Sequence, residues 1–367
     1  MTIHVEEHPA RQGSIGVITL DAPATLNALS ETMIDRMLVT LEAWASDERI
    51  CLVLLQGKGD RGFCAGGNIR DLYQAIRDGS NPQRPAHFFS QEYRLDYTLH
   101  RFPKPVIGFA HGVTMGGGLG LLTGCRYRLV TPDVTLAMPE LAIGLFPDVG
   151  ASWFLNRLPE GLGLFLGLTG ARLNVSDALR VGLADMVVNA DARAPLLAQL
   201  KETAWTGEVA ADDNRLYRLL NRLENPMPDT LPASQLADHE RTIARLCQAE
   251  DLPGIVHAIQ QETIDSDWWQ ACQAQLQAGC PTSAWLFHEQ LKRGRQLSLK
   301  DVFKMELTLA ARCIERPDLA EGIRARLIDR SQPPRWRYPT IESVPAEDVD
   351  AHFRSPWPDA EHPLWDL

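Results

Sequence analysis

Short runs rich in β-branched residues alternate with helical patterns through the first half of the chain, and this alternation constrains the fold more than any other feature. Such runs, mostly bounded by turn residues, are typical of strands. They cover residues 3–8, 13–20, 50–57, 104–112 and 127–138. A strand and helix alternation predicts an α/β fold, in which sheet and helices share one core.

One helix is predicted clearly between these strands, at residues 30–46. Ser30 is a suitable N-cap, because its hydroxyl can accept a hydrogen bond from the first helical turn. Apolar residues then recur at helical spacing, which indicates a buried face. That face is predicted to contain Met33, Ile34, Met37, Leu38 and Leu41.

The strand signals stop near residue 190, and helical patterns follow at 194–205, 213–224, 283–296 and 300–315. We therefore predict a core at 1–190, a mostly helical C-terminal region at 191–353 and a tail at 354–367. The proline-rich stretch 225–234 predicts a loop inside the helical region. That region could close on its own core or exchange between subunits, so a homo-oligomer is possible.

Composition excludes several classes of function. With 45% apolar and 23% charged residues, the 367-residue chain has an ordinary globular composition. Its net charge of −11, without a run of five basic residues, argues against nucleic acid or anionic membranes as partners. The first ten residues show no targeting pattern and no apolar run reaches membrane length, which favours a cytoplasmic protein.

The cysteine pattern also favours a cytoplasmic protein. Their number is odd, at seven, and they show neither CxxC nor Cys/His spacing. This pattern predicts reduced thiols in a reducing compartment, with no disulfide framework and no zinc.

A glycine-rich stretch, HGVTMGGGLGLLTGC at 111–125, follows a predicted strand and opens an apolar segment. Gly116, Gly117 and Gly118 therefore predict a tight turn into a helix, whose first N–H groups could bind a ligand oxygen. Close packing of helix on sheet would also require small residues here. A nicotinamide site is disfavoured, because the glycine spacing departs from the usual fingerprint.

A second segment shows the same pattern of a strand followed by small residues and a helix. The segment GDRGFCAGGNIRDLY at 59–73 predicts a strand, a loop of small residues and a helix that begins near Asn68. Two such loops could direct two N–H groups at one oxygen. That is the geometry of an oxyanion hole, where negative charge develops on a carbonyl oxygen.

Two acids follow in an otherwise apolar stretch, MPELAIGLFPDVG at 138–150. Taken alone, Glu140 and Asp148 could be solvated caps, as most carboxylates are. In a pocket, desolvation and mutual repulsion would instead tune the pair for acid/base or nucleophilic work.

Together these segments resemble the crotonase (enoyl-CoA hydratase/isomerase) superfamily in order and spacing. The resemblance rests on LNALS at 26–30, GFCAGGNIRDL, HGVTMGGGLGL and MPELAIGLFPDVGASWFLNRLP. Within it, FFSQEYRLDY at 88–97 and LAEGIRARLIDRSQPPRW at 319–336 resemble the branch of 3-hydroxyisobutyryl-CoA hydrolases. The resemblance covers nearly all residues to about 353 and implies a spiral of ββα turns.

The resemblance also implies roles for individual residues. Gly67 and Gly117 would donate N–H groups to the thioester oxygen. Glu140 and Asp148 would lie beside the acyl group, and Glu92 would contact the substrate. The backbone at Leu26, Ala28 and Ala65 would hold CoA. No metal or redox cofactor is implied, since CoA is part of the substrate.

Two positions depart from the family pattern. Gly120 stands where enoyl-CoA hydratases carry a second glutamate, and water addition needs two carboxylates. Asn68 replaces the aspartate usual in the hydrolases, although asparagine can still cap a helix.

The implied activity is hydrolysis of a short branched 3-hydroxyacyl-CoA, first of all 3-hydroxyisobutyryl-CoA, as in valine breakdown. The alternatives are a hydratase or isomerase of the same superfamily and a non-catalytic acyl-CoA-binding protein.

Other candidates have plainer interpretations. His111 is favoured as a structural histidine over a general base, and Cys64 as a packed thiol over a nucleophile. Lys58, Arg61 and Arg70 could bind CoA phosphates or be solvated surface charges.

Overall fold

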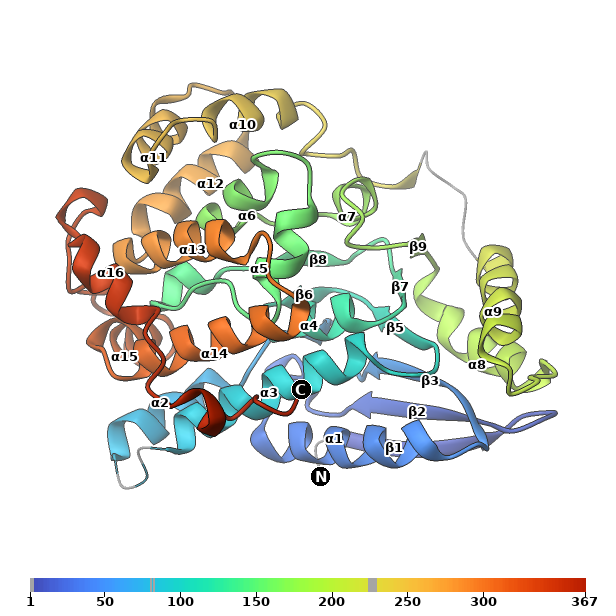
Figure 1. Cartoon of the computed structure of the whole chain (residues 1–367). Coiled ribbons are helices and arrows are strands. Elements are labelled where there is room, and N and C mark those ends of the chain that lie inside the picture. The colour runs from blue at the N-terminus through green and yellow to red at the C-terminus, as the bar shows by residue number, and fades with distance from the viewer. Residues whose placement is uncertain (1–2, 80, 82, 224–229) are drawn as a thin grey trace. The chain divides into compact units, whose positions relative to one another are not determined.

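The computed structural model describes residues 3–79, 81, 83–223 and 230–367 (Figure 1). The chain divides into two compact units. Unit 1 contains Met1–Gly67, Leu95–Leu136 and Leu173–Gln235. Unit 2 contains Asn68–Arg94, Ala137–Arg172 and Leu236–Leu367. The boundaries predicted at residues 190 and 353 stay a prediction.

A six-stranded sheet forms the centre of unit 1. It has the order β1 (Ile3–Pro9), β2 (Ser14–Leu20), β3 (Ile50–Gly57), β5 (Val106–Ala110), β7 (Tyr127–Val130) and β9 (Met186–Val187). β1 is antiparallel to β2, and the other pairs are parallel. A second, three-stranded sheet has the order β4 (Gly62–Cys64), β6 (Val113–Met115) and β8 (Thr135–Ala137).

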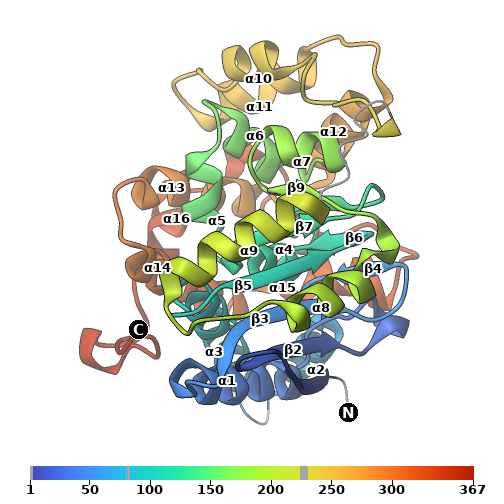
Figure 2. The same ribbon diagram turned by 90° about the vertical axis from the view of Figure 1, so that its right-hand side faces the viewer.

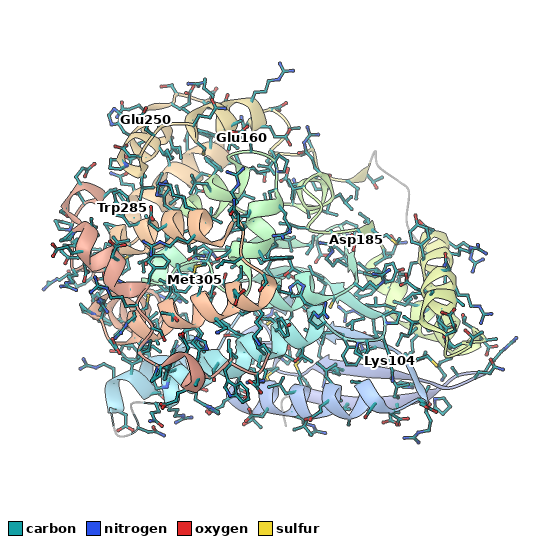
Figure 3. All side chains as sticks on the ribbon, viewed as in Figure 1. Lys104, Glu160, Asp185, Glu250, Trp285 and Met305 are labelled. Atoms are coloured by element: carbon teal, nitrogen blue, oxygen red, sulfur yellow. The ribbon has the colours of Figure 1, made fainter. Side chains whose placement is uncertain are left out.

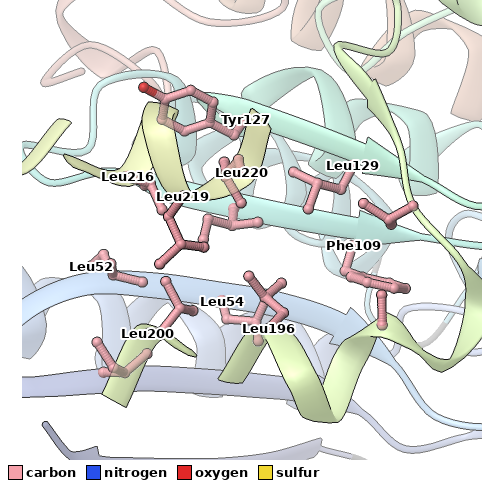
Figure 4. Close-up of a cluster of buried hydrophobic side chains, with 14 of the residues drawn as sticks. Leu52, Leu54, Phe109, Tyr127, Leu129, Leu196, Leu200, Leu216, Leu219 and Leu220 are labelled. Carbon is pink, nitrogen blue, oxygen red and sulfur yellow. The ribbon is translucent and has the colours of Figure 1, made fainter. Parts of the chain in front are cut away.

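Helices α8 (Arg193–Glu202) and α9 (Val209–Leu223) cover one face of the large sheet, as Figure 2 shows. Their leucines interdigitate with strand side chains in the buried cluster of Figure 4. Unit 1 also contains α4 (Gly117–Gly124) and α7 (Val175–Arg180). Strands buried on both faces explain the near-continuous apolar runs in β2 and β3.

Helix α1 (Glu31–Ser46) confirms the predicted helix, and the Ser30 hydroxyl accepts a hydrogen bond from the Met33 N–H. One predicted member of its buried face was wrong. Leu38 is only half-buried, and Trp44 is buried instead. A Cβ on Gly16 of β2 would lie 2.6 Å from the Trp44 ring, so the indole packs where that strand has no side chain.

Unit 2 is predominantly helical (Figure 1). Its helices are α2 (Ile69–Asp78), most of α3 (Arg84–His100), α5 (Ala151–Phe154), α6 (Leu162–Thr169), α10 (Glu240–Leu246), α11 (Leu252–Gln261), α12 (Asp267–Ala278), α13 (Pro281–Gly294), α14 (Leu299–Ile314), α15 (Pro317–Ile323) and α16 (Ala346–His352). Large aromatic side chains fill its interior, among them Phe165, Trp269, Phe287 and Phe303. Figure 3 marks Trp285 on α13 and Met305 on α14.

The structure confirms the predicted α/β class and the helical character of the later chain. Two predicted strands were too long. The run at 104–112 ends in β5 at Ala110, and the run at 127–138 is broken between β7 and β8 by Thr131-Pro132-Asp133, where proline removes a donor. Of the loop predicted at 225–234, residues 225–229 lie outside the described residues, as does the last residue of the helix predicted at 213–224.

The approach of α4 to β4 gives a stability prediction. A Cβ on Gly118 would lie 2.1 Å from the Cys64 carbonyl oxygen, so Gly118→Ala should lower the free energy of unfolding by about 3 kcal/mol through overpacking. Gly79→Ala is the matched control, because a Cβ added there meets no described atom within 4 Å and only its φ of +62° opposes alanine. That variant should lose about 1 kcal/mol. Equal losses in chemical denaturation would contradict this account.

Candidate active site

The two glycine loops of unit 1 lie against each other. Gly116 caps α4 with a φ of +50°, as the sequence predicted for a turn into a helix. Gly66 has a φ of +97°, and a Cβ there would lie 3.3 Å from the Gly117 nitrogen. Only glycine combines this backbone conformation with such a close approach. Within unit 1 the structure therefore brings together residues 59–67 and the segment 111–125.

The N–H groups of Gly67 and Gly117 remain available in these loops. Within the described part of the chain, neither has a backbone acceptor outside regular elements, and Gly117 lies in the first turn of α4, where no intrahelical acceptor exists. These are the donors that the family resemblance implies for an oxyanion. Their role stays a prediction.

The loop at 26–30 is tied to the Gly67 loop by backbone hydrogen bonds. The Leu29 N–H donates to the Gly66 carbonyl at 2.8 Å, and the Ala65 N–H donates to the Leu26 carbonyl at 2.9 Å. The Ala28 N–H donates to the Thr25 carbonyl. Since the N–H groups of Ala28 and Ala65 are used internally, a contact of these residues with CoA would have to use their carbonyl groups.

Asn27 organises this loop and was not predicted from the sequence. Leu26 and Asn27 both have left-handed backbone, with φ of 54° and 56°. The fully buried Asn27 amide donates to the carbonyls of Lys58 and Gly62 and accepts from the Ala22 N–H. Asparagine tolerates left-handed backbone better than most residues, which was the only available signal.

The remaining sequence candidates in unit 1 are engaged in the fold. His111 is buried, its Nδ1 lies 2.5 Å from the Arg193 guanidinium, and burial lowers its pKa to about 4. Cys64 is buried and takes part in no disulfide. Lys58 donates to Asp21, and Arg61 donates to the Pro23 carbonyl.

In unit 2, Asn68 caps α2 by accepting from the Asp71 N–H, which confirms the expected start of that helix. Arg70 reaches the Leu327 carbonyl at 3.5 Å.

The three acids named from the sequence are buried near one another in unit 2. Glu92 comes from α3, Glu140 from a short 3₁₀ turn (Glu140–Ile143), and Asp148 from the loop before α5. Their residues are 2%, 6% and 4% exposed. The structure thus brings together the acids named from the sequence in this unit.

Burial raises the pKa values of all three acids, and repulsion by Asp148 adds to the rise for the two glutamates. Burial raises the pKa of Glu140, and the charge of Asp148 raises it further. The same two causes, in the same order, raise the pKa of Glu92. Burial raises the pKa of Asp148 to about 7. One oxygen each of Glu92 and Glu140 has no hydrogen-bond partner among the described residues.

Tyr93 is a further member of this cluster that sequence reasoning missed. Its buried hydroxyl donates to Asp148 Oδ2 at 2.7 Å, and this bond partly offsets the rise in the pKa of Asp148. The bond also fixes the direction of the carboxyl group. Its position directly after Glu92 gave no clue, because neighbours on a helix point in different directions.

Neither a metal-binding cluster nor a membrane-spanning helix is found in the described part of the chain. There, no group of three or more side chains is arranged to hold a metal ion. Likewise, no helix in the described ranges is long and apolar enough to cross a membrane.

The chain is similar to known proteins of the family that its sequence motifs resemble. Residues 15–353 match the family model described as "Enoyl-CoA hydratase/isomerase". A Gallus gallus protein named 3-hydroxyisobutyryl-CoA hydrolase, mitochondrial, is 37% identical over 350 residues, covering 94% of this chain and 87% of that protein. The Homo sapiens protein of the same name is 35% identical over 345 residues, with the same coverage.

Solved structures confirm the crotonase-like fold. A structure titled as a carnitinyl-CoA dehydratase from Mycobacterium thermoresistibile has a TM-score of 0.85 at 30% identity, covering 100% of this chain and 99% of the other. One titled as an enoyl-CoA hydratase from Rhodobacter sphaeroides has a TM-score of 0.81 at 31% identity, covering 96% and 97%.

The raised pKa of Asp148 predicts how stability depends on pH. A group that binds its proton more tightly when folded stabilises the fold at low pH. For Asp148 that contribution is complete below about 3.8 and is lost as pH rises through about 7. Asp148→Asn should therefore raise Tm relative to the native protein at pH 8, and the difference should shrink toward pH 4.

Asp47 provides a control of opposite sign. Its pKa is lowered to about 2, chiefly by the Arg49 side chain, so its contribution is present above pH 3.8 and lost as pH falls. Asp47→Asn should lower Tm at neutral pH or leave it unchanged. Thermal melts from pH 4 to 8 decide the matter, and an Asp148→Asn variant that is less stable at pH 8 would contradict a repulsive, desolvated cluster.

Proposed function

Because the chain belongs to the enoyl-CoA hydratase/isomerase family, we propose that it is an acyl-CoA thioester hydrolase. The substrate we propose is a short branched 3-hydroxyacyl-CoA, with 3-hydroxyisobutyryl-CoA first, as in valine breakdown. The names of the Gallus gallus and Homo sapiens relatives support this choice. Those names also contain the word mitochondrial, so the cytoplasmic location expected from the sequence stays a prediction.

The observation that carries the proposal is the buried acid cluster. Unpaired buried carboxyl groups are costly and rarely serve stability, since removing them from water disfavours their charged form. Burial and the charge of Asp148 raise the pKa of Glu140, and burial raises the pKa of Asp148 to about 7, where a group can both take up and release a proton. Such a pair suits hydrolysis at neutral pH.

The proposed mechanism assigns each group one task. The N–H groups of Gly67 and Gly117 polarise the thioester carbonyl and stabilise the oxyanion as charge moves onto oxygen. Glu140, once ionised, activates a water molecule or attacks directly to give a transient anhydride that water then hydrolyses. Asp148, protonated at the start, orients the substrate or water and donates its proton to the departing CoA thiolate, and a proton released from the attacking water restores it. Cleavage of the C–S bond yields the free acid and CoA.

Nothing in this mechanism calls for a metal or redox cofactor, and CoA enters as part of the substrate. Glu92 contacts the acyl group in this proposal, and the backbone at Leu26, Ala28 and Ala65 holds the CoA portion. The proposed mechanism is compatible with a homo-oligomer.

A hydratase is the second candidate, because the two similar solved structures carry dehydratase and hydratase titles. Glu92 could supply the acid that Gly120 lacks. A binding protein without chemistry is the third. Intact Glu140 and Asp148 argue against it.

A panel of acyl-CoA substrates tests the proposal directly. Free thiol should appear with 3-hydroxyisobutyryl-CoA and 3-hydroxypropionyl-CoA, and crotonyl-CoA should be hydrated poorly, because the hydratase glutamate is replaced by Gly120. Thiol release and loss of enoyl absorbance are measured separately. Rapid hydration of crotonyl-CoA without thiol release would favour the hydratase, and inertness toward every thioester would favour the binding protein.

Substitution of the two acids tests the mechanism. Glu140→Gln should lower kcat by about 10² to 10⁴, the range for loss of a positioned acid/base group. Asp148→Asn should also lower kcat, and the double variant should lose much less than the product of the two effects, because groups that act as a unit are non-additive. An unchanged kcat in Glu140→Gln, measured per folded molecule, would sink the mechanism.

A further inference from the structure

The loop that carries Asp148 has an unfavourable backbone. Val149 has a φ of +53° and is 1% exposed, although a β-branched residue rarely adopts the left-handed region. Gly150 follows with a φ of +86°. A strained conformation of this kind persists only where the surrounding structure enforces it. The groups that enforce it therefore also control the direction of the Asp148 side chain.

Glu306 of α14 holds the far side of this loop. Its carboxylate is fully buried, and it accepts from the Gly150 N–H at 2.7 Å with Oε2 and from the Ser152 N–H at 2.9 Å with Oε1. Both oxygens are thus used on backbone that begins two residues after Asp148. Bonds from two N–H groups favour the charged form, although burial outweighs them and raises the pKa of Glu306 to about 8.

The near side of the loop is held as well. The Gln290 amide of α13 donates to the Pro147 carbonyl at 2.5 Å. Buried side chains of α13 and α14 therefore form hydrogen bonds with the backbone on both sides of Asp148. With this backbone fixed, the Tyr93 hydroxyl meets Asp148 Oδ2.

We propose that Glu306 is a positioning residue, which holds the strained Val149–Ser152 backbone so that Asp148 keeps the orientation its chemistry needs. This inference rests on the proposed function, in which Asp148 acts on the thioester. Neither the family resemblance nor any sequence pattern pointed to Glu306, which lies in the middle of an amphipathic helix. The helical C-terminal part of unit 2 would then contribute to the reaction and not only to stability.

A purely structural role is the alternative, and the chain offers a matched control for it. Asp212 in unit 1 is also a buried carboxylate that accepts from two consecutive backbone N–H groups, those of Thr206 and Gly207, each at 2.8 Å. Asp212 lies in α9, and the proposed mechanism gives it no task. Replacing either carboxylate by an amide makes the same chemical change.

The experiment compares Glu306→Gln with Asp212→Asn. The comparison is made above pH 8, where Glu306 is ionised. An amide then offers an acceptor oxygen to only one N–H and turns an NH₂ group toward the other, so both variants should lower Tm. Only Glu306→Gln should lower kcat per folded molecule, by about ten- to hundredfold with KM within about threefold, as expected for a misplaced reacting group. Asp212→Asn should keep kcat within about twofold of the native protein.

A double variant shows whether the effect passes through Asp148. Adding Glu306→Gln to Asp148→Asn should lower kcat by less than about twofold further, because a positioning residue has nothing left to position. If the two losses in kcat multiply in the double variant, or if Glu306→Gln alone has a native kcat, the inference is overturned.

Crystal structures of the native protein and Glu306→Gln provide a readout that does not depend on activity. The variant should release Val149 from positive φ and break the Tyr93–Asp148 hydrogen bond, while the remainder of unit 2 keeps its fold. An unmoved loop would overturn the inference even if the native protein released no thiol. Absence of thiol release from the native protein would by itself count against the proposed function alone.

Discussion

The burial of a cluster of carboxyl groups in one helical unit is the constraint on which the rest of that unit depends. Glu92, Glu140 and Asp148 repel one another when charged, and each has lost most of its contact with water. A fold bears such a cost only if its other contacts exceed it, and the packed aromatic interior of unit 2 supplies apolar burial of that kind. Raised pKa values are the result, because protonation relieves both the desolvation and the repulsion.

Local signals in the sequence were sufficient for the elements that shape the glycine loops. Ser30 and Asn68 were identified as helix caps because capping needs only a short polar side chain next to its own helix. Gly116 was identified because a triple glycine after a strand and before an apolar run fits few conformations other than a tight turn into a helix. Within such segments the physics involves only near neighbours, so the sequence carries it almost completely.

The groups that sequence reasoning missed act across long separations. Tyr93 reaches Asp148 over 55 positions, and Glu306 reaches Gly150 over 156. Nothing local distinguishes Glu306 from a solvated glutamate on the polar face of a helix, since its burial depends on how α14 packs. The error at Leu38 has the same origin: helical spacing defines a stripe, and the sheet decides which edge of that stripe it covers.

Gly120 links these observations to the choice of chemistry. Addition of water to a double bond needs one carboxylate to activate water and another to exchange a proton, and α4 contributes none from this position. Thioester hydrolysis also uses a base or nucleophile, which is Glu140 in the proposed mechanism, and its thiolate leaving group has a pKa of about 8.5 and is served by a proton donor of comparable strength. With its pKa raised to about 7 and its direction fixed by Tyr93, Asp148 meets that requirement near neutral pH. A fully solvated aspartate would hold too little of its proton there to serve, so the desolvation that costs stability is also what suits this acid to the proposed hydrolysis.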